Sequence, residues 1–311
     1  MLISPKILYG DCYGRYAIPA VNVFTMEQII ALFRSAEKAD APFIVQITPA
    51  ARDYANSNIL LSIIEEASKL YPKATYFVHL DHGNEIHAFD AIKSNKYNSV
   101  MIDASHDEFE KNVERTSSVV TEAHKKNIFV EAELGVLSGK EDDISIDEEM
   151  AKFTKPSEVF SFVNMTRCDS LAVAVGTSHG AYKFKGSKGI QFNILREIQK
   201  ILPGFPIVLH GGSGVNFEEI NRINKSGGNL DEGAAGVPPD QIIKSISYGV
   251  CKINIATDLR LLWARVHREF FMHSPGLFDP TIPGKKYIEE FEEFMINKFK
   301  LLGGYGKASK I

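Results

Sequence analysis

The chain has little cysteine and no long apolar run. Its three cysteines, Cys12, Cys168 and Cys251, are an odd number at unrelated spacings, which supports neither a disulfide framework nor a thiolate zinc site. No segment approaches the roughly 18 consecutive apolar residues of a transmembrane helix. The first residues, MLISPKILYGDCYGRY, lack the apolar stretch of a signal peptide. We therefore expect a cytoplasmic protein with reduced cysteines and no membrane partner.

An excess of charge of one sign is also absent. The 311 residues include 35 basic and 39 acidic side chains, for a formal net charge of −4, and no basic block. Nucleic acid is therefore not an expected partner. The 44% hydrophobic content is enough to bury a large core. Because no Gly/Ser-rich or Pro-rich linker divides the chain, we expect a single domain over residues 1–311.

Short β-branched runs alternate with segments of helical periodicity, which is typical of repeated βα units around a parallel sheet. Their near-continuous apolar character indicates strands that are covered on both faces. Eight runs occur, at 17–23, 42–47, 76–81, 99–103, 128–134, 170–175, 205–210 and 250–255. Helices are expected between them, for example at 26–39, 57–70, 108–125 and 258–271. The pattern predicts an α/β fold, a (β/α)8 TIM barrel, with an extra C-terminal helical segment at 285–302.

Polar residues gather where the expected strands end. Asp81 and His82 close the third run in FVHLDHGN, Asp103 closes the fourth, and the glycine-rich stretches GTSHG and HGGSG follow the sixth and seventh. Burying an uncompensated charge costs several kcal/mol, so a purely structural core has no use for so many ionisable groups. Active sites of TIM barrels lie at this end of the strands. The rim is therefore the candidate site.

Three histidines on this rim suggest a zinc ion. His82, His179 and His210 follow three different expected strands, and three protein ligands with an open position are the pattern of a catalytic zinc. A lone histidine is more often a packing or surface residue, so the inference depends on the convergence of all three. His79 would lie deeper in the barrel, and we interpret it as a supporting or packing residue.

The glycine clusters suggest an anion site. GTSHGAYKF and LHGGSG leave backbone N–H groups open to a phosphate, with Lys183 and Ser213 nearby. Each cluster alone fits a plain turn equally well. Their place after the sixth and seventh strands favours phosphate, because many TIM barrels hold a phosphate close to this position.

Six motifs, in this order and spacing, resemble those of one enzyme family. They are FVHLDHG, SVMIDASH, VEAELG, AVAVGTSHGAYKF, VLHGGSG and VCKINIATDLR. They resemble the class II, zinc-dependent ketose-bisphosphate aldolases, in particular the fructose-1,6-bisphosphate aldolases, from about residue 17 to the C-terminal KLLGG. The resemblance implies a glycolytic lyase that cleaves fructose 1,6-bisphosphate to dihydroxyacetone phosphate and glyceraldehyde 3-phosphate, working as a homodimer or homotetramer. It implies one catalytic zinc ion, with a monovalent cation as a further candidate cofactor.

The resemblance also implies roles for individual residues. His82, His179 and His210 match the zinc ligands. Asp81 matches the aspartate that exchanges the proton of the C4 hydroxyl, and Glu141, in SGKEDD, matches a mobile-loop glutamate that reprotonates the three-carbon intermediate. For Asp81 the alternative is a helix N-cap before residue 84. For Glu141 the alternative is a solvated acidic loop.

The remaining matched positions are candidate contacts to the substrate or to a second metal position. Asn254 matches the residue that holds the enediolate, and Arg260 resembles an arginine that binds the far phosphate. Asp103 and Glu133 match positions linked to an alternative inner metal site. The C1-phosphate cradle corresponds to Gly180, Lys183, Gly211, Ser213 and Thr257. Asn22 and Thr48, at the ends of the first two strands, are further candidate substrate contacts.

The same residues favour metal-assisted cleavage over two rival classes of protein. Zinc acts as a Lewis acid on the charge that C3–C4 cleavage leaves behind, so no lysine Schiff base is needed. A zinc hydrolase of the amidohydrolase kind would carry H-x-H on the first strand, where this chain reads PAVNVF. A non-catalytic binding barrel predicts losses among the three histidines or Asp81, and all four are present.

One position departs from the usual pattern. Relatives commonly read N-x-D-T-D after the eighth strand, and this chain has Ala256 in place of the first aspartate. Tagatose-bisphosphate aldolases often have alanine there. Tagatose 1,6-bisphosphate, which differs at C4, or another dihydroxyacetone-phosphate-dependent ketose phosphate therefore stays open as the substrate.

Overall fold

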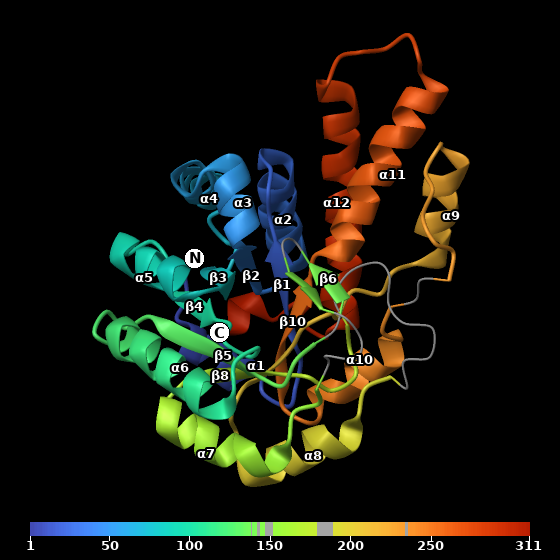
Figure 1. The fold of residues 1–311 in the computed structure, drawn as a ribbon. Helices are drawn as coiled ribbons and strands as arrows, with labels where there is room; N and C mark the ends of the chain where they lie inside the picture. Colours follow the sequence, from blue (N-terminus) through green and yellow to red (C-terminus); the bar gives the residue numbers. More distant parts are fainter. Residues whose placement is uncertain (138, 142–143, 147–151, 179–188, 234–235) are drawn as a thin grey trace.

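Eight parallel strands close into a barrel in the order β1-β10-β9-β8-β5-β4-β3-β2 (Figure 1). The structure, a computed structural model, describes residues 1–137, 139–141, 144–146, 152–178, 189–233 and 236–311, and for 139–141 and 144–146 the backbone only. The barrel strands are β1 Ile18–Asn22, β2 Phe43–Ile47, β3 Tyr76–Gly83, β4 Ser99–Ile102, β5 Phe129–Leu134, β8 Ser170–Val173, β9 Ile207–Leu209 and β10 Val250–Ile255. All eight predicted strands are present, so the predicted (β/α)8 barrel is confirmed.

Helices surround the barrel and fill the connections between strands (Figure 1). A short antiparallel pair, β6 Gly139–Glu141 and β7 Ile144–Ile146, follows β5. The helices are α1 Pro5–Cys12, α2 Met26–Ala39, α3 Pro49–Ala55, α4 Ser57–Leu70, α5 Glu85–Ser94, α6 Phe109–His124, α7 Pro156–Thr166, α8 Phe192–Ile201, α9 Phe217–Lys225, α10 Pro239–Ile246, α11 Thr257–His273 and α12 Thr281–Leu301. In the part of the chain that is described, no helix is both long and apolar enough to cross a membrane.

Helix α1 lies at the N-terminal end of the strands. Its Leu8, Tyr9 and Cys12 form one buried cluster with barrel residues such as Ile44 and Phe77. The Tyr9 ring meets the Phe77 ring edge-on, with centroids 5.9 Å apart, a favoured aromatic geometry. This end of the barrel is filled by apolar packing, which places polar chemistry at the other end.

The start of α5 settles one alternative from the sequence. Asn84 is the N-cap: its side-chain oxygen accepts a hydrogen bond from the His87 backbone N–H over 3.1 Å, as capping residues do. Asp81 lies inside β3 and does not cap the helix. The N-cap interpretation of Asp81 is therefore wrong.

The C-terminal helices α11 and α12 form a hairpin that projects beyond the barrel (Figure 1). At its base α12 packs on α2, where Gln28 Nε2 donates to the Tyr287 hydroxyl over 3.1 Å and Arg34 and Lys38 pair with Glu292. The predicted C-terminal helical segment is confirmed and is longer than the periodicity indicated.

Candidate active site

The end of β3 aims two neighbouring side chains at the same space. The strand continues past its predicted end at Asp81 to Gly83, and its register against β4 shifts between Leu80 and Gly83. His82 has a φ of 47°, in the left-handed region that non-glycine residues seldom adopt. Such irregularities re-aim side chains next to active sites. Asp81 and His82 therefore face one site although successive strand residues normally point to opposite faces.

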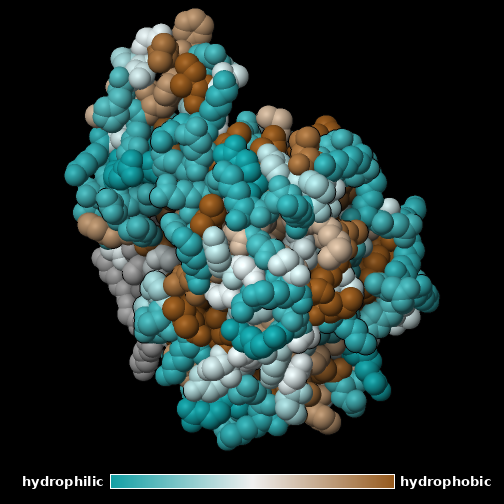
Figure 2. Space-filling model, turned by 180° about the vertical axis from the view of Figure 1, so that it is seen from behind, coloured by the Kyte–Doolittle hydropathy of each residue, from teal (hydrophilic) through white to brown (hydrophobic). Residues whose placement is uncertain are grey.

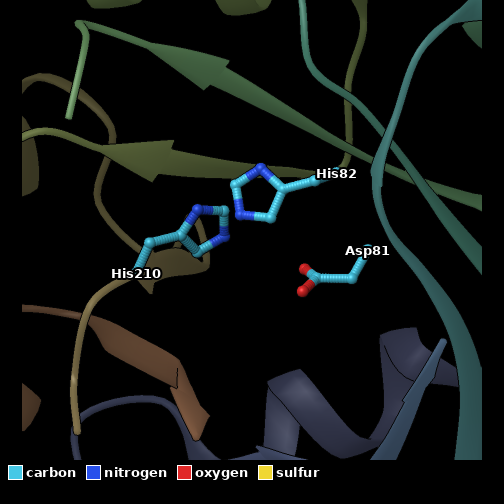
Figure 3. A group of neighbouring side chains, drawn as sticks. All are labelled: Asp81, His82 and His210. Carbon is cyan, nitrogen blue, oxygen red and sulfur yellow. The ribbon is translucent and has the colours of Figure 1, made fainter. Parts of the chain in front are cut away.

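His82 and His210 converge above the barrel interior (Figure 3). Their ring centroids are 4.6 Å apart, and both side chains are buried. His210 follows β9 directly. With Asp81 they form a group whose potential ligand atoms all lie within 4.8 Å of one another. Two of the three predicted zinc ligands are thus brought together.

A carboxylate oxygen lies within hydrogen-bonding distance of one ring nitrogen of each imidazole. His82 Nδ1 lies 3.0 Å from Asp103 Oδ2, and His210 Nε2 lies 3.1 Å from Glu131 Oε1. Metal-binding histidines typically use the second ring nitrogen in this way, which fixes the ring for coordination. Glu133 Oε2 lies 3.4 Å from His210 Nδ1. The donor set and its supports fit a bound divalent metal ion.

Nearby carboxylates stabilise the protonated forms of both histidines. Burial disfavours the imidazolium form, but the Asp81 charge and the hydrogen bond to Asp103 outweigh it and raise the pKa of His82. At His210 burial is likewise outweighed, chiefly by Glu133, and the pKa rises to about 9.

Asp103 and Glu133 also form a second group with His82 that could hold a metal ion. The potential ligand atoms of this group lie within 4.8 Å of one another, and Asp103 and Glu133 are the positions expected for an inner metal site.

Asp81 is held at both carboxylate oxygens. Asn254 Nδ2 donates to Oδ1 over 3.0 Å and Asn22 Nδ2 donates to Oδ2 over 2.9 Å. Gln46 Nε2 donates in turn to Asn22 Oδ1 over 2.6 Å. Burial raises the pKa of Asp81, but the nearby His82 and Lys252 charges lower it below its usual value overall. A fully buried carboxylate is thus kept ionised and oriented.

The loop after β9 passes very close to the backbone of Ser178, which follows β8. Gly211 has a φ of +64°, and a Cβ there would lie 2.4 Å from the Ser178 carbonyl oxygen. Only glycine fits without rearrangement. Asp258 in α11 accepts hydrogen bonds from the backbone N–H groups of Gly214 at 3.0 Å and Val215 at 2.8 Å. Ser213, a predicted phosphate contact, is buried in this loop.

Thr257 and Arg260 lie in the first turn of α11. The Arg260 guanidinium stands 4.9 Å from the centroid of the Phe24 ring, and a pocket of about 400 Å³ opens beside it. That pocket is lined by Phe24, Thr25, Gln28, Tyr54, Arg260 and Trp263. Thr48 has a local structural contact, because its hydroxyl accepts from the Ala51 N–H at the start of α3.

Three predicted site residues, His179, Gly180 and Lys183, lie outside the described residues, and Glu141 ends β6 in a stretch where only the backbone is described.

The sequence motifs did not identify the buried Lys252, which donates to Glu131. The available signal was a single lysine inside the apolar run VCKINI. Asn22 and Asn254, expected to touch substrate, both hold Asp81.

Comparison with known proteins finds one family along nearly the whole chain. The family model described as fructose-bisphosphate aldolase class-II matches residues 7–229 and 232–307. A fructose-bisphosphate aldolase of Giardia intestinalis is 38% identical over 94% of this chain and 90% of the relative. One from Thermus caldophilus is 38% identical over 94% of this chain and 95% of the relative.

Solved structures share the fold. The YdjI aldolase from Escherichia coli K12 superposes with a TM-score of 0.78 at 25% identity, covering 99% of this chain and all of that one. A structure described as a fructose-1,6-bisphosphate aldolase from Coccidioides immitis gives 0.81 at 24% identity, with 98% and 96% covered. With the family model matching nearly the whole chain, this protein belongs to the class-II fructose-bisphosphate aldolases.

Proposed function

We propose that this protein is a zinc-dependent lyase of the cytoplasm that cleaves fructose 1,6-bisphosphate into dihydroxyacetone phosphate and glyceraldehyde 3-phosphate. The proposal rests on Asp81, a buried and ionised carboxylate held by two asparagines beside two converging imidazoles. A general base must be ionised and oriented toward the proton that it removes.

In the cleavage direction an Asp81 oxygen accepts the proton of the C4 hydroxyl. The C3–C4 bond then breaks, the C4 carbon leaves as the aldehyde, and the bond electrons stay on the three-carbon fragment. Glu141 is the candidate acid that returns a proton to that fragment. Asn22 and Asn254 keep the Asp81 carboxylate from turning during these steps.

His82, His210 and His179 would hold the zinc ion. Zinc supplies Lewis-acid stabilisation of the negative charge that cleavage leaves on the former ketone. Asp103 and Glu131 fix the orientation of the two described imidazoles. Gly211, Ser213 and Thr257, with Gly180 and Lys183, are the proposed contacts of the C1 phosphate, and Arg260 is the proposed contact of the far phosphate.

The test is an activity assay on metal-free and zinc-loaded protein. Chelation should abolish cleavage of fructose 1,6-bisphosphate, and added Zn²⁺ should restore it. Treatment with borohydride in the presence of substrate should leave activity unchanged. Inactivation by borohydride would indicate a lysine Schiff base and would overturn the proposal, as would full activity after complete removal of metal.

Tagatose 1,6-bisphosphate is the second candidate substrate, and Ala256 is the observation that favours it. This residue is buried directly before α11, two residues after Asn254. Its methyl group cannot accept a hydrogen bond from a sugar hydroxyl. A site that lacks a polar partner for a hydroxyl discriminates weakly between epimers.

A homodimer or homotetramer is the proposed assembly. Apolar side chains are exposed along the projecting hairpin, namely Trp263, Phe271, Met272, Leu277, Phe278 and Ile282. Figure 2 shows brown, hydrophobic residues gathered at the end of this projection. Exposed apolar clusters of this kind favour protein–protein contact.

A further inference from the structure

Lys252 is a fully buried lysine inside the barrel, directly below the candidate metal site. Its Nζ lies 2.8 and 2.9 Å from the two Glu131 oxygens, 3.2 Å from His79 Nε2 and 3.9 Å from Asp81 Oδ1. A buried ammonium is costly unless it is paired and hydrogen-bonded. Each of these four atoms can accept a hydrogen bond or carries negative charge, so the surroundings of Lys252 stabilise a positive charge.

The hydrogen bonds around Lys252 have one consistent direction. An ammonium group only donates, so His79 Nε2 accepts from it, and His79 Nδ1 is left to donate to the Ser99 hydroxyl oxygen 2.8 Å away. Burial and the Lys252 charge lower the pKa of His79 to about 3, in keeping with a neutral acceptor ring. On the other side both Glu131 oxygens accept from Lys252.

Lys252 also fills a place that a metal ion could take. His79, Asp81 and Glu131 form a buried group whose potential ligand atoms lie within 4.8 Å of one another. The ammonium lies among these three residues. The group of His79, Asp81 and Glu131 is therefore occupied by a covalently attached cation.

Glu131 connects this cation to the metal site. Its Oε1 is 3.1 Å from His210 Nε2. With Glu131 bound to Lys252 at both oxygens, the carboxylate cannot rotate away from the His210 ring. A histidine whose Nε2–H is held in this way presents Nδ1 to a metal.

We propose that Lys252 is a positioning residue: it holds Glu131 as the acceptor of the His210 Nε2–H and thereby fixes His210 for metal binding. In this role Lys252 acts on His210 through Glu131. The inference rests on the proposed metal-binding function of His210. A purely structural role for Lys252 would affect folding stability without affecting the metal site.

The test compares Lys252→Met with Arg265→Met as a matched control. Arg265 is a second large buried cation among the residues that the structure describes; it is 2% exposed and pairs with Glu219, Glu269 and Glu290 next to the hairpin. Both changes remove a buried charge and should lower the unfolding midpoint. Only Lys252→Met should raise the zinc dissociation constant, measured by competition with a chromophoric chelator, by about 10- to 100-fold, the usual effect of losing a support behind a ligand.

A second readout does not depend on metal or on activity. In protein labelled with ¹⁵N-histidine, the His210 Nε2–H should give a slowly exchanging resonance in the wild type and in Arg265→Met, assigned by its loss in His210→Ala. In Lys252→Met the resonance should broaden or vanish. Failure of the wild type to bind zinc would contradict the proposed function, whereas this resonance would still test the role of Lys252.

The double variant Lys252→Met/Glu131→Gln keeps the proposal testable if Lys252→Met does not fold. It removes both charges, so no carboxylate is left buried and unpaired, and stability should partly recover. Zinc affinity and the slow Nε2–H exchange should not recover, because an amide can turn either end toward His210. Wild-type zinc affinity together with wild-type Nε2–H exchange, in Lys252→Met or in the double variant, would overturn the proposal.

Discussion

Asn254 Nδ2 lies 3.0 Å from Asp81 Oδ1, so a residue of β10 fixes a carboxylate of β3 on the far side of β1 and β2 in the barrel order. Asn22 of β1 binds the other oxygen. The carboxylate plane is thus set by two strands that Asp81 does not belong to. The barrel closure itself is what orients the candidate base.

Asp81→Ala should separate catalysis from metal binding. Loss of a positioned general base typically costs about 10²- to 10⁴-fold in rate, so kcat should fall by that order. Zinc content, measured by atomic absorption, should stay near that of the wild type because His82 and His210 are retained. Asp53→Ala, an exposed position on α3, is the control. Unchanged turnover in Asp81→Ala would remove it from the mechanism.

Replacing each proposed zinc ligand should lower metal content as well as activity. His82→Ala, His210→Ala and His179→Ala should each abolish cleavage, because the three imidazoles are proposed to share one ion. The exposed His273→Ala is the control. Full zinc occupancy in any of the three variants would exclude that residue from the ligand set.

Asp258→Asn should weaken the link between the β9 loop and the C-terminal helices. The carboxylate accepts from Gly214 and Val215 and pairs with Lys298 at 3.0 Å. Hydrogen bonds to a charged group contribute about 1.5–3 kcal/mol, so the free energy of unfolding at pH 7 should fall by about that amount. The Michaelis constant for the bisphosphate should also rise, because the phosphate loop loses its anchor.

The pH dependence of this contribution has a defined sign. Burial raises the pKa of Asp258, but Lys298 and the two backbone N–H groups outweigh it and lower the pKa below its usual value. The stabilisation is therefore full above the unfolded pKa of about 3.9 and is lost as pH falls through the lower folded pKa. In urea titrations the wild type should lose stability more steeply below about pH 4 than Asp258→Asn does. Parallel curves would contradict the assignment.

The sequence predicted the barrel because its eight apolar runs alternate with helical segments, and the strands and helices follow from that local pattern. It also placed Asp81, His82 and His210 on one rim, since each lies at or near a strand end. The bulge that turns His82 beside Asp81 could not be predicted, because it depends on the register between β3 and β4. Register is a property of the closed sheet and leaves no mark in a single strand.

Lys252 was missed for a related reason. A lysine in an apolar run is compatible with a bulge, a strand edge or an inward ion pair. Only the assembled barrel shows that Glu131 and His79 face it from β5 and β3. The hydrogen bonds from Asn22 and Asn254 to Asp81 could likewise not be predicted, because sequence motifs do not reveal which side chains contact one another.

The oligomer should depend on the hairpin between α11 and α12. Phe278 is 91% exposed at its tip, and an aromatic side chain in that state gains much from burial against a partner. Sedimentation of the wild type should show a species larger than 34.6 kDa. Phe278→Asp should shift the equilibrium toward the monomer, and Tyr305→Asp, an exposed aromatic away from the hairpin tip, should not. A monomeric wild type at working concentration would contradict the proposed assembly.

Ala256→Asp tests the choice between C4 epimers. The residue precedes α11 as its N-cap, and no side chain caps that helix now. An aspartate there would supply a cap, adding about 1 kcal/mol of stability, and would place a hydrogen-bond acceptor two residues after Asn254.

We expect the wild type to cleave fructose and tagatose 1,6-bisphosphate with similar kcat/KM. Ala256→Asp should favour fructose by about tenfold or more, since a hydrogen bond to a charged group contributes about 1.5–3 kcal/mol. Ala256→Ser, which also caps the helix but adds no charge, separates stability from selectivity. A strong fructose preference in the wild type that Ala256→Asp leaves unchanged would show that position 256 takes no part in the choice.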